Sequence, residues 1–126
     1  IKEHLVDVKE DGSIRLNLDY FDYCTGLTMT SERFDELFGG PPRKAEARLT
    51  QRDLDLAASI QAITEEVVLK LGRSIATETG EKHLCLAGGV ALNCVANGKL
   101  ARSQCFERAY KLEEPIGAVC GQVGNP

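Results

Sequence analysis

The 126-residue sequence has no tryptophan, one methionine and two histidines, and aromatic residues make up only 6% of it. So few aromatic side chains provide no stacking platform for nucleic acid, and a net charge of −4 does not supply the clustered cations that bind phosphate backbones. No nucleic-acid partner is expected. No apolar run approaches the roughly 20 residues that cross a bilayer, and no signal-peptide pattern opens the chain. The expected location is therefore the cytoplasm, without membrane attachment.

The sequence also lacks the patterns of several site classes. Its five cysteines are odd in number and are not spaced as zinc or disulfide motifs, so reduced thiols in the core are expected. His83 has no second histidine or carboxylate at ligand spacing, so we predict no metal site. Hydrolase motifs, the dinucleotide fingerprint and the Walker loop are absent. The remaining composition, 43% hydrophobic and 27% charged, is that of one modest globular domain.

The N-terminal part of the sequence predicts a β-hairpin. Apolar and polar residues alternate over residues 4–9 and again over residues 13–20. Between these runs stands the pair Asp11 and Gly12, which is a strong turn signal. We expect an antiparallel hairpin with one face packed and the other in water. A short helix over residues 32–38 follows, which Thr30 or Ser31 could cap.

The best-defined element is a long helix over residues 51–78. Thr50 and Asp53 have the spacing of a capping box at its start, and Gly80 offers a left-handed stop at its end. Apolar residues extend around more than one side, so a central helix packed on several faces is expected. Gly72 inside the helix predicts either a close neighbour or a tolerated flaw, and the carboxylate of Glu65 is expected to be solvated.

The feature that points to chemistry is a glycine pair, Gly88 and Gly89. It stands between a strand predicted over residues 83–87 and a helix predicted over residues 90–102. Such a turn lets the backbone approach a ligand, and the first amides of a helix lack intrahelical partners and favour negative charge. The turn is therefore suited to a phosphate. A turn needed only for packing would give the same pattern.

Two asparagines follow the glycine pair at a spacing that puts them on one helix face. They are Asn93 and Asn97, four residues apart. Their amides could bond a ribose or phosphate oxygen, or they could be satisfied by neighbouring backbone. The predicted ligand-binding residues are Gly88, Gly89, Val90 and Asn93. A further strand is expected over residues 109–112.

The stretch around the glycine pair resembles a known family. Its central residues are Ala87, Gly88, Gly89, Val90, Ala91, Leu92, Asn93, Cys94, Val95, Ala96 and Asn97. This stretch is similar to the carbamoyltransferase family that includes the nodulation-factor, cephamycin and tobramycin enzymes. Segments at residues 38–43, 49–53 and 55–61 match the same family in the same order. The resemblance covers about residues 11–106.

The resemblance implies both a fold and a reaction. The fold is α/β, a partial RNase H-like lobe of the actin, Hsp70 and sugar-kinase ATPase type, with an N-terminal β-hairpin, a long central helix and a strand–glycine pair–helix unit. Family members use ATP and carbamoyl phosphate, form a carbamoyl-adenylate and pass the carbamoyl group to a hydroxyl of a small-molecule acceptor. In that fold Gly88, Gly89 and Val90 lie against the nucleotide, with Asn93 close by.

The chain also departs from the family pattern. The histidine cluster that holds a metal ion in the complete enzyme has no match here, since neither His4 nor His83 fits it, and no aspartate follows Asp55. We therefore expect an inactive fragment, a single incomplete domain. Its expected regions are a β-hairpin region over 1–29, a helical region over 30–80, a nucleotide-binding α/β unit over 81–112 and an atypical tail over 113–126.

Two other functions remain open. The first is a non-catalytic module that self-associates, as a homodimer, through apolar faces at Leu56, Ile60 or Val67. The second is another ATPase of the same superfold, which the residues at 59–61 and 93–94 favour less.

Overall fold

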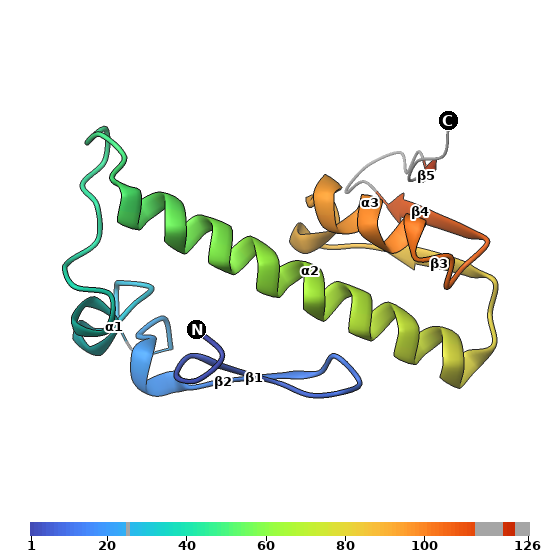
Figure 1. The fold of residues 1–126 in the computed structure, drawn as a ribbon, viewed down its shortest axis with the longest axis horizontal. Helices are drawn as coiled ribbons and strands as arrows, with labels where there is room; N and C mark the ends of the chain where they lie inside the picture. The colour runs from blue at the N-terminus through green and yellow to red at the C-terminus, as the bar shows by residue number, and fades with distance from the viewer. Residues whose placement is uncertain (25, 113–119, 123–126) are drawn as a thin grey trace. The chain divides into compact units, whose positions relative to one another are not determined.

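The fold is described by a computed structural model that covers residues 1–24, 26–112 and 120–122. It is a mixed α/β arrangement with small sheets and one long helix, α2 (Figure 1). The elements in chain order are β1 (Val6–Val8), β2 (Ile14–Leu16), η1 (Leu18–Tyr20), α1 (Glu32–Leu37), α2 (Gln51–Thr79), β3 (His83–Leu86), η2 (Gly89–Leu92), α3 (Cys94–Arg102), β4 (Arg108–Leu112) and β5 (Cys120–Gln122). Apart from β5, the tail expected over 113–126 lies outside the described residues.

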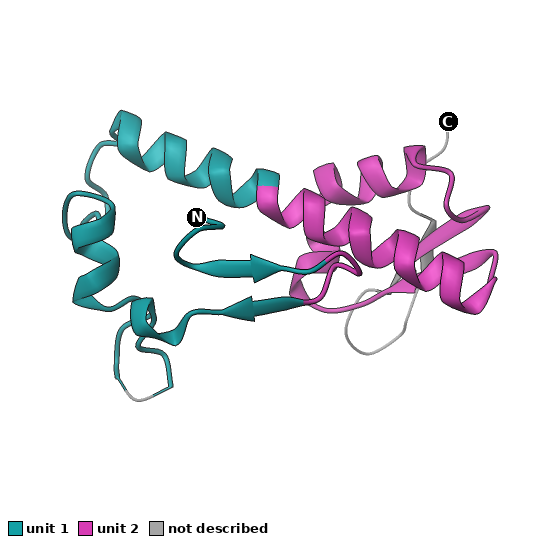
Figure 2. Cartoon of the chain, turned by 60° about the horizontal axis from the view of Figure 1, so that its bottom comes forward, with its two compact units in different colours: residues 1–9, 14–62 teal, residues 10–13, 63–126 magenta. Residues whose placement is uncertain are grey.

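Contacts divide the chain into two compact units. Unit one holds residues 1–9 and 14–62, and unit two holds residues 10–13 and 63–126 (Figure 2). Because α2 begins in the first unit and ends in the second, its two parts have different neighbours. None of the helices in the described residues is long and apolar enough to span a bilayer.

The predicted hairpin forms in unit one, but it is shorter and less packed than expected. β1 and β2 pair antiparallel, with Val6 opposite Leu16 and Val8 opposite Ile14. The second strand ends early because the side chain of Asn17 accepts a hydrogen bond from the amide of Asp19 and starts the 3₁₀ turn η1. Every residue of β2 is exposed, so the packed face is confined to β1. A lone two-stranded hairpin has no second layer to bury its face.

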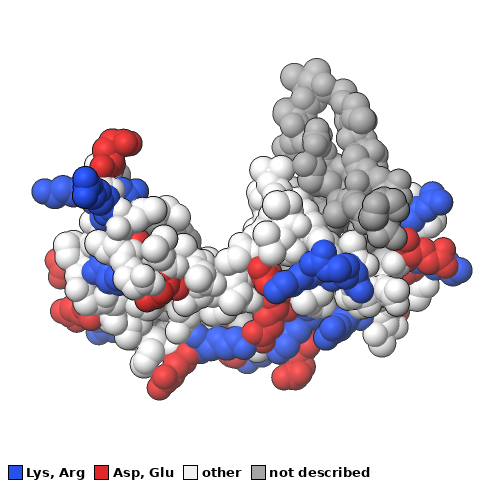
Figure 3. Space-filling model, turned by 45° about the horizontal axis from the view of Figure 1, so that its top comes forward, with Lys and Arg blue, Asp and Glu red and all other residues white. Residues whose placement is uncertain are grey.

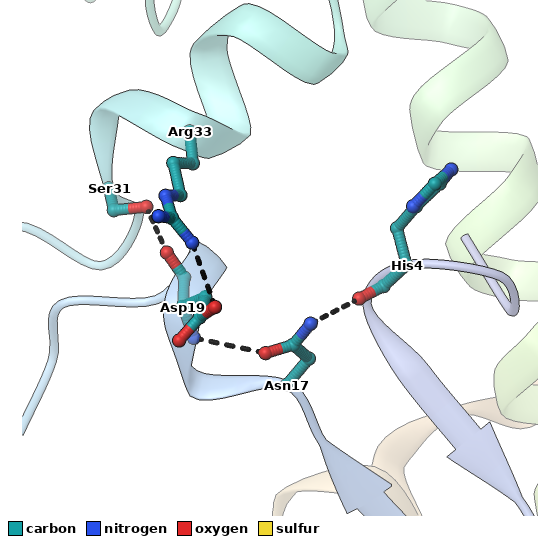
Figure 4. Close-up of polar contacts among 5 residues, drawn as sticks. All are labelled: His4, Asn17, Asp19, Ser31 and Arg33. Carbon is teal, nitrogen blue, oxygen red and sulfur yellow. Dashed lines mark hydrogen bonds and ion pairs between the residues drawn. The ribbon is translucent and has the colours of Figure 1, made fainter.

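A polar network fixes η1 on both sides (Figure 4). The side-chain Nδ2 of Asn17 donates to the carbonyl of His4 over 3.0 Å, while the imidazole of His4 points away from this contact. Arg33 of α1 donates to the Asp19 carboxylate over 2.8 Å, and the hydroxyl of Ser31 donates to the Asp19 carbonyl over 2.8 Å. Ser31 therefore does not cap α1 with its side chain, although α1 follows it as predicted.

The end of α1 is tied to the start of α2 by one arginine. The guanidinium of Arg52 donates to the carbonyl of Pro41 over 2.8 Å and to that of Phe38 over 3.5 Å. Gly40, at φ +152°, lies beneath this guanidinium, where a Cβ would come within 2.7 Å of an Arg52 nitrogen. Aromatic packing adds to the same corner, since the rings of Phe34 and Phe38 have centroids 4.7 Å apart.

Helix α2 begins and ends as predicted. The Asp53 carboxylate accepts from the amide of Thr50 over 2.8 Å and from its hydroxyl over 2.7 Å. These two bonds hold the pKa of Asp53 below its ordinary value. At the other end Gly80 takes φ +67°, and its amide donates to the carbonyl of Ala76 over 3.0 Å. Both ends are specified by local bonds.

The expectation that α2 is packed on several faces is wrong for its first half. Leu54 is 49% exposed and Ile60 is 50% exposed, because few described residues of unit one cover this part of the helix. Burial increases in the second half, where Glu65 and Gly72 are enclosed, while Leu71 and Ile75 are still 38% and 39% exposed. The expectation of a solvated Glu65 is therefore also wrong.

The packing of unit two centres on the second half of α2. Leu100 of α3 lies directly over Gly72, so that a Cβ at residue 72 would overlap its Cδ1 atom. About two helical turns before Gly72, the carboxylate of Glu65 pairs with Lys99 of α3. The hairpin turn also belongs to this unit, and Gly12 at φ +87° packs onto the backbone of Leu71. Gly72 is thus explained by a close neighbour, one of the two predicted alternatives.

The sheet of unit two has the order β3-β4-β5. β3 and β4 run parallel, with His83 opposite Arg108 and Leu86 opposite Lys111, while β4 and β5 are antiparallel. The described cysteines Cys24, Cys85, Cys94 and Cys105 are free, but the first three are exposed, contrary to the expected core position. For Cys85 the reason is strand alternation, since Leu84 and Leu86 take the more buried side of β3.

Candidate functional site

The glycine pair lies directly after the carboxyl end of β3, as predicted, but the helix does not follow at once. Gly88 takes φ +90°, and a 3₁₀ turn, η2, occupies residues Gly89–Leu92. Two bonds of 3₁₀ type define it: the amide of Ala91 donates to the Gly88 carbonyl over 3.0 Å, and that of Asn93 donates to the Val90 carbonyl over 2.9 Å. Helix α3 begins only at Cys94. The predicted start at residue 90 is therefore wrong.

The start of α3 is delayed because Asn93 is its N-cap. The side-chain oxygen of Asn93 accepts a hydrogen bond from the amide of Ala96 over 3.0 Å. This cap already satisfies one of the first helical amides. An anion at the glycine pair would therefore meet the amides of the turn, whereas the first amides of α3 lie one 3₁₀ turn further along the chain.

The turn itself is open. Gly88, Gly89 and Val90 are all exposed, with Val90 at 59%. A Cβ built on Gly88 or Gly89 would meet no atom within 4 Å. Within the described part of the chain, the amides of these three residues donate to no acceptor. Three successive backbone donors are thus accessible, and such donors suit the oxygens of an anion.

The two asparagines that sequence placed on one face have separate roles. Asn93 is half-buried at the junction of η2 and α3, and its side-chain oxygen is the acceptor of the cap. Asn97 is 5% exposed, and its Nδ2 donates to the carbonyl of Ala91 over 2.7 Å. Asn97 is therefore satisfied by backbone, the alternative left open above, and does not face a ligand.

Comparison with known proteins identifies the family of the chain. The family model described as the carbamoyltransferase N-terminus matches residues 1–115, which include the whole glycine turn. The chain belongs to this family. The resemblance stated from sequence is thereby confirmed.

Several curated proteins are similar to this carbamoyltransferase N-terminal chain. An uncharacterized protein of Synechocystis is 52% identical over 124 residues, which is 98% of this chain and 20% of that protein. The nodulation protein NolNO of Sinorhizobium fredii is 46% identical over 68 residues, or 54% of this chain and 10% of that protein. A tRNA N6-adenosine threonylcarbamoyltransferase of Polaromonas is 32% identical over 82 residues, covering 65% and 23% respectively.

The chain thus covers 20% of the length of the Synechocystis protein and 10% of that of NolNO. No solved structure matches it at a significant level. The carbamoyltransferase assignment therefore comes from sequence similarity, and the geometry of the turn is an independent observation.

A second feature of the carbamoyltransferase chain lies at the opposite edge of the unit-two sheet. A cavity of about 650 Å³ adjoins the amino ends of β3 and β4 and is lined in part by Lys82, Arg102 and Glu107. Lys82 and Glu107 pair over 2.6 Å, and this bond raises the pKa of Lys82 and lowers the pKa of Glu107. Glu81 also lines the cavity, so its two cations and two carboxylates balance and the lining carries no net charge to attract an anion.

Metal ligands do not gather in the described residues of this family member. No three side chains of His, Cys, Asp or Glu come close enough there to hold an ion. His83 instead packs edge-on against Tyr110, with ring centroids 6.2 Å apart. Cationic and anionic side chains are interspersed over the described residues on the face drawn in Figure 3.

Proposed function

We propose that this chain supplies a phosphate-binding turn to an ATP-dependent carbamoyltransferase. The observation that carries the proposal is the set of exposed amides at Gly88, Gly89 and Val90, at the carboxyl end of a parallel strand. Ligands of open α/β sheets bind at that edge. Membership of the carbamoyltransferase N-terminus family supports the choice of reaction.

In this proposal the chain's own residues bind and orient the nucleotide. Phosphate oxygens accept hydrogen bonds from the amides of Gly88, Gly89 and Val90, and Asn93 lies beside them. The missing side chains at residues 88 and 89 leave room for the phosphate to approach the backbone. ATP, when bound, supplies the phosphoanhydride bond that activates the carbamoyl group.

The fold type, the reaction of the complete enzyme and its location are proposed together with this site. The fold is a part of an RNase H-like lobe of the actin, Hsp70 and sugar-kinase type. The complete enzyme moves the carbamoyl group from carbamoyl phosphate, by way of carbamoyl-adenylate, to a hydroxyl of a small-molecule acceptor. We place this reaction in the cytoplasm, where ATP is available. Any metal ion of the complete enzyme would be held by residues other than those described here.

A binding titration tests the turn directly. ATP and inorganic phosphate are titrated separately into the wild-type chain and into Gly89→Val, with heat or fluorescence as the signal. The valine side chain would occupy the open space over the turn, so affinity should fall at least about tenfold, which corresponds to about 1.4 kcal/mol. The fold should survive, because no described atom lies within 4 Å of a Cβ at that position.

The control variant is Ala58→Val, which adds comparable bulk to an exposed position of α2 in unit one. It should bind both ligands like the wild type. Equal affinity in wild type and Gly89→Val, or no ATP binding by the wild-type chain, would contradict the proposal. In a carbamoylation assay we expect no turnover from the isolated chain, because the described residues include backbone donors but no complete catalytic set.

A second candidate function is self-association without catalysis. One observation favours it: of the three apolar positions predicted to form a contact face, Ile60 is exposed, while Leu56 and Val67 are half-buried. Exposed apolar side chains of this kind favour association between copies of a chain. We propose a homodimer as the form that this alternative would take.

A further inference from the structure

A buried side chain of α3, that of Asn97, hydrogen-bonds to the turn. Two hydrogen bonds run within the turn and its ends, from Ala91 to Gly88 and from Asn93 to Val90. Another comes from outside the turn, because Nδ2 of Asn97 donates to the carbonyl of Ala91 over 2.7 Å. Both partners are buried, so water does not compete for this bond.

Asn97 itself is held in place by the packing of α3. In the next turn of the helix, Leu100 lies over Gly72 of α2, and Lys99 pairs with the carboxylate of Glu65. Glu65 is 8% exposed, so this ion pair is shielded on its acidic side. A continuous set of contacts therefore runs from α2 through α3 and Asn97 to the carbonyl of Ala91.

We propose that Asn97 is a positioning residue that fixes the conformation of η2 and so maintains the exposed turn in which the amides of Gly88, Gly89 and Val90 have no acceptor among the described residues. Its effect on ligand affinity rests on the proposed function, whereas its effect on the turn does not. Direct contact between Asn97 and a ligand is excluded by geometry. Its donor group already bonds the Ala91 carbonyl, and the side chain is 5% exposed.

A purely structural role makes a different prediction. A residue that only stabilises unit two would, when altered, speed amide exchange throughout α2, α3 and η2 together. A residue that positions the turn changes exchange mainly at the amides that close it, those of Ala91 and Asn93. The location of the change therefore separates the two roles.

The experiment measures amide hydrogen exchange in the whole 126-residue chain without ligand. In Asn97→Ala the amides of Ala91 and Asn93 should exchange at least about tenfold faster, while amides in residues 63–79 of α2 keep their wild-type rates. Asn97→Ser, which loses less volume and keeps a short donor, is the second variant if the alanine variant does not fold. It should show a smaller change at the same two amides. Leu5→Ala removes a buried side chain from unit one and should leave both amides unchanged.

The same variants are then titrated with ATP and with inorganic phosphate at a temperature where each is folded. Asn97→Ala should bind at least about tenfold more weakly than the wild type, and Leu5→Ala should bind equally well. Wild-type exchange at Ala91 and Asn93 in both Asn97 variants would overturn the proposal, as would a uniform increase over unit two. If the wild-type chain binds neither ligand, the proposed function fails, and the exchange data still decide the role of Asn97.

Discussion

Asp53 is a residue whose charge state matters for the start of α2. Its carboxylate accepts two hydrogen bonds from Thr50, and these bonds lower its pKa from the ordinary 3.8. The ionised form is therefore favoured in the folded chain. The contribution of these bonds to the stability of the folded chain is fully present above pH 3.8. It is lost as the pH falls through the lower pKa of the folded state.

The lowered pKa of Asp53 predicts a pH-dependent difference in stability between the wild type and Asp53→Asn. The wild-type chain should be the more stable of the two near neutral pH, and the difference in unfolding free energy should shrink as the pH falls below about 4. Urea unfolding at a series of pH values measures it. In Thr50→Ala, a carboxyl NMR titration should find the pKa of Asp53 raised toward its ordinary value. An unchanged pKa there would contradict the assigned cause.

At the same scale, sequence predicted the capping pair but not the burial of Glu65 or the bond made by Asn97. Thr50 and Asp53 are three residues apart, so their interaction is local and readable from spacing. Glu65 is buried because Lys99, which is distant in sequence, reaches it. For Asn97 the sequence left ligand and backbone equally open, because the position of the Ala91 carbonyl depends on η2.

At the scale of the elements, substituting the glycines of α2 and α3 in unit two should change stability in opposite directions. A methyl group at Gly98 would approach only the mobile end of Arg102, at 3.3 Å, whereas one at Gly72 would overlap the buried side chain of Leu100. Gly98→Ala should therefore stabilise the chain by up to about 1 kcal/mol through helix propensity. Gly72→Ala should destabilise it, because overpacking costs about 1–3 kcal/mol and exceeds that gain.

Thermal or urea unfolding of the two variants measures both signs. A third variant, Gly72→Ala with Leu100→Val, removes a methylene from the crowded site and should recover part of the lost stability. If Gly72→Ala raises stability as much as Gly98→Ala does, the close packing of α3 on α2 is not as described.

The elements were predicted best where their limits are set by neighbouring residues. Helix α2 has a cap at one end and Gly80 at the other, and its bounds agree with the prediction to within a residue. The start of α3 was missed because Val90, Ala91 and Leu92 suit a helix as well as a 3₁₀ turn. The cap at Asn93 decides between them, and asparagine, a favoured N-cap residue, was the signal available in the sequence.

For the whole molecule, sequence predicted the place of the glycine turn more fully than the packing around it. The glycine turn is exposed at the edge of a parallel pair of strands, as the pattern indicated. The extent of core packing was overestimated, because periodicity indicates which side of a helix is apolar but not whether another element covers it. The exposed first half of α2 is the main example.

This exposure predicts how the whole chain behaves in solution. If the exposed apolar residues drive self-association, the wild-type chain should show an apparent mass that rises with concentration in light scattering. The double variant Leu54→Lys and Ile60→Lys should remain monomeric, because two charges then replace apolar side chains that are about half exposed. A wild-type chain that stays monomeric at every concentration would remove the dimer from consideration.

Gly40 meets two separate obstacles to substitution. A Cβ at residue 40 would come within 2.7 Å of the Arg52 guanidinium, and the backbone at φ +152° disfavours any side chain whatever the space around it. A smaller residue at position 52 would remove the first obstacle but not the second. Glycine therefore remains the favoured residue at position 40 even where the arginine is replaced.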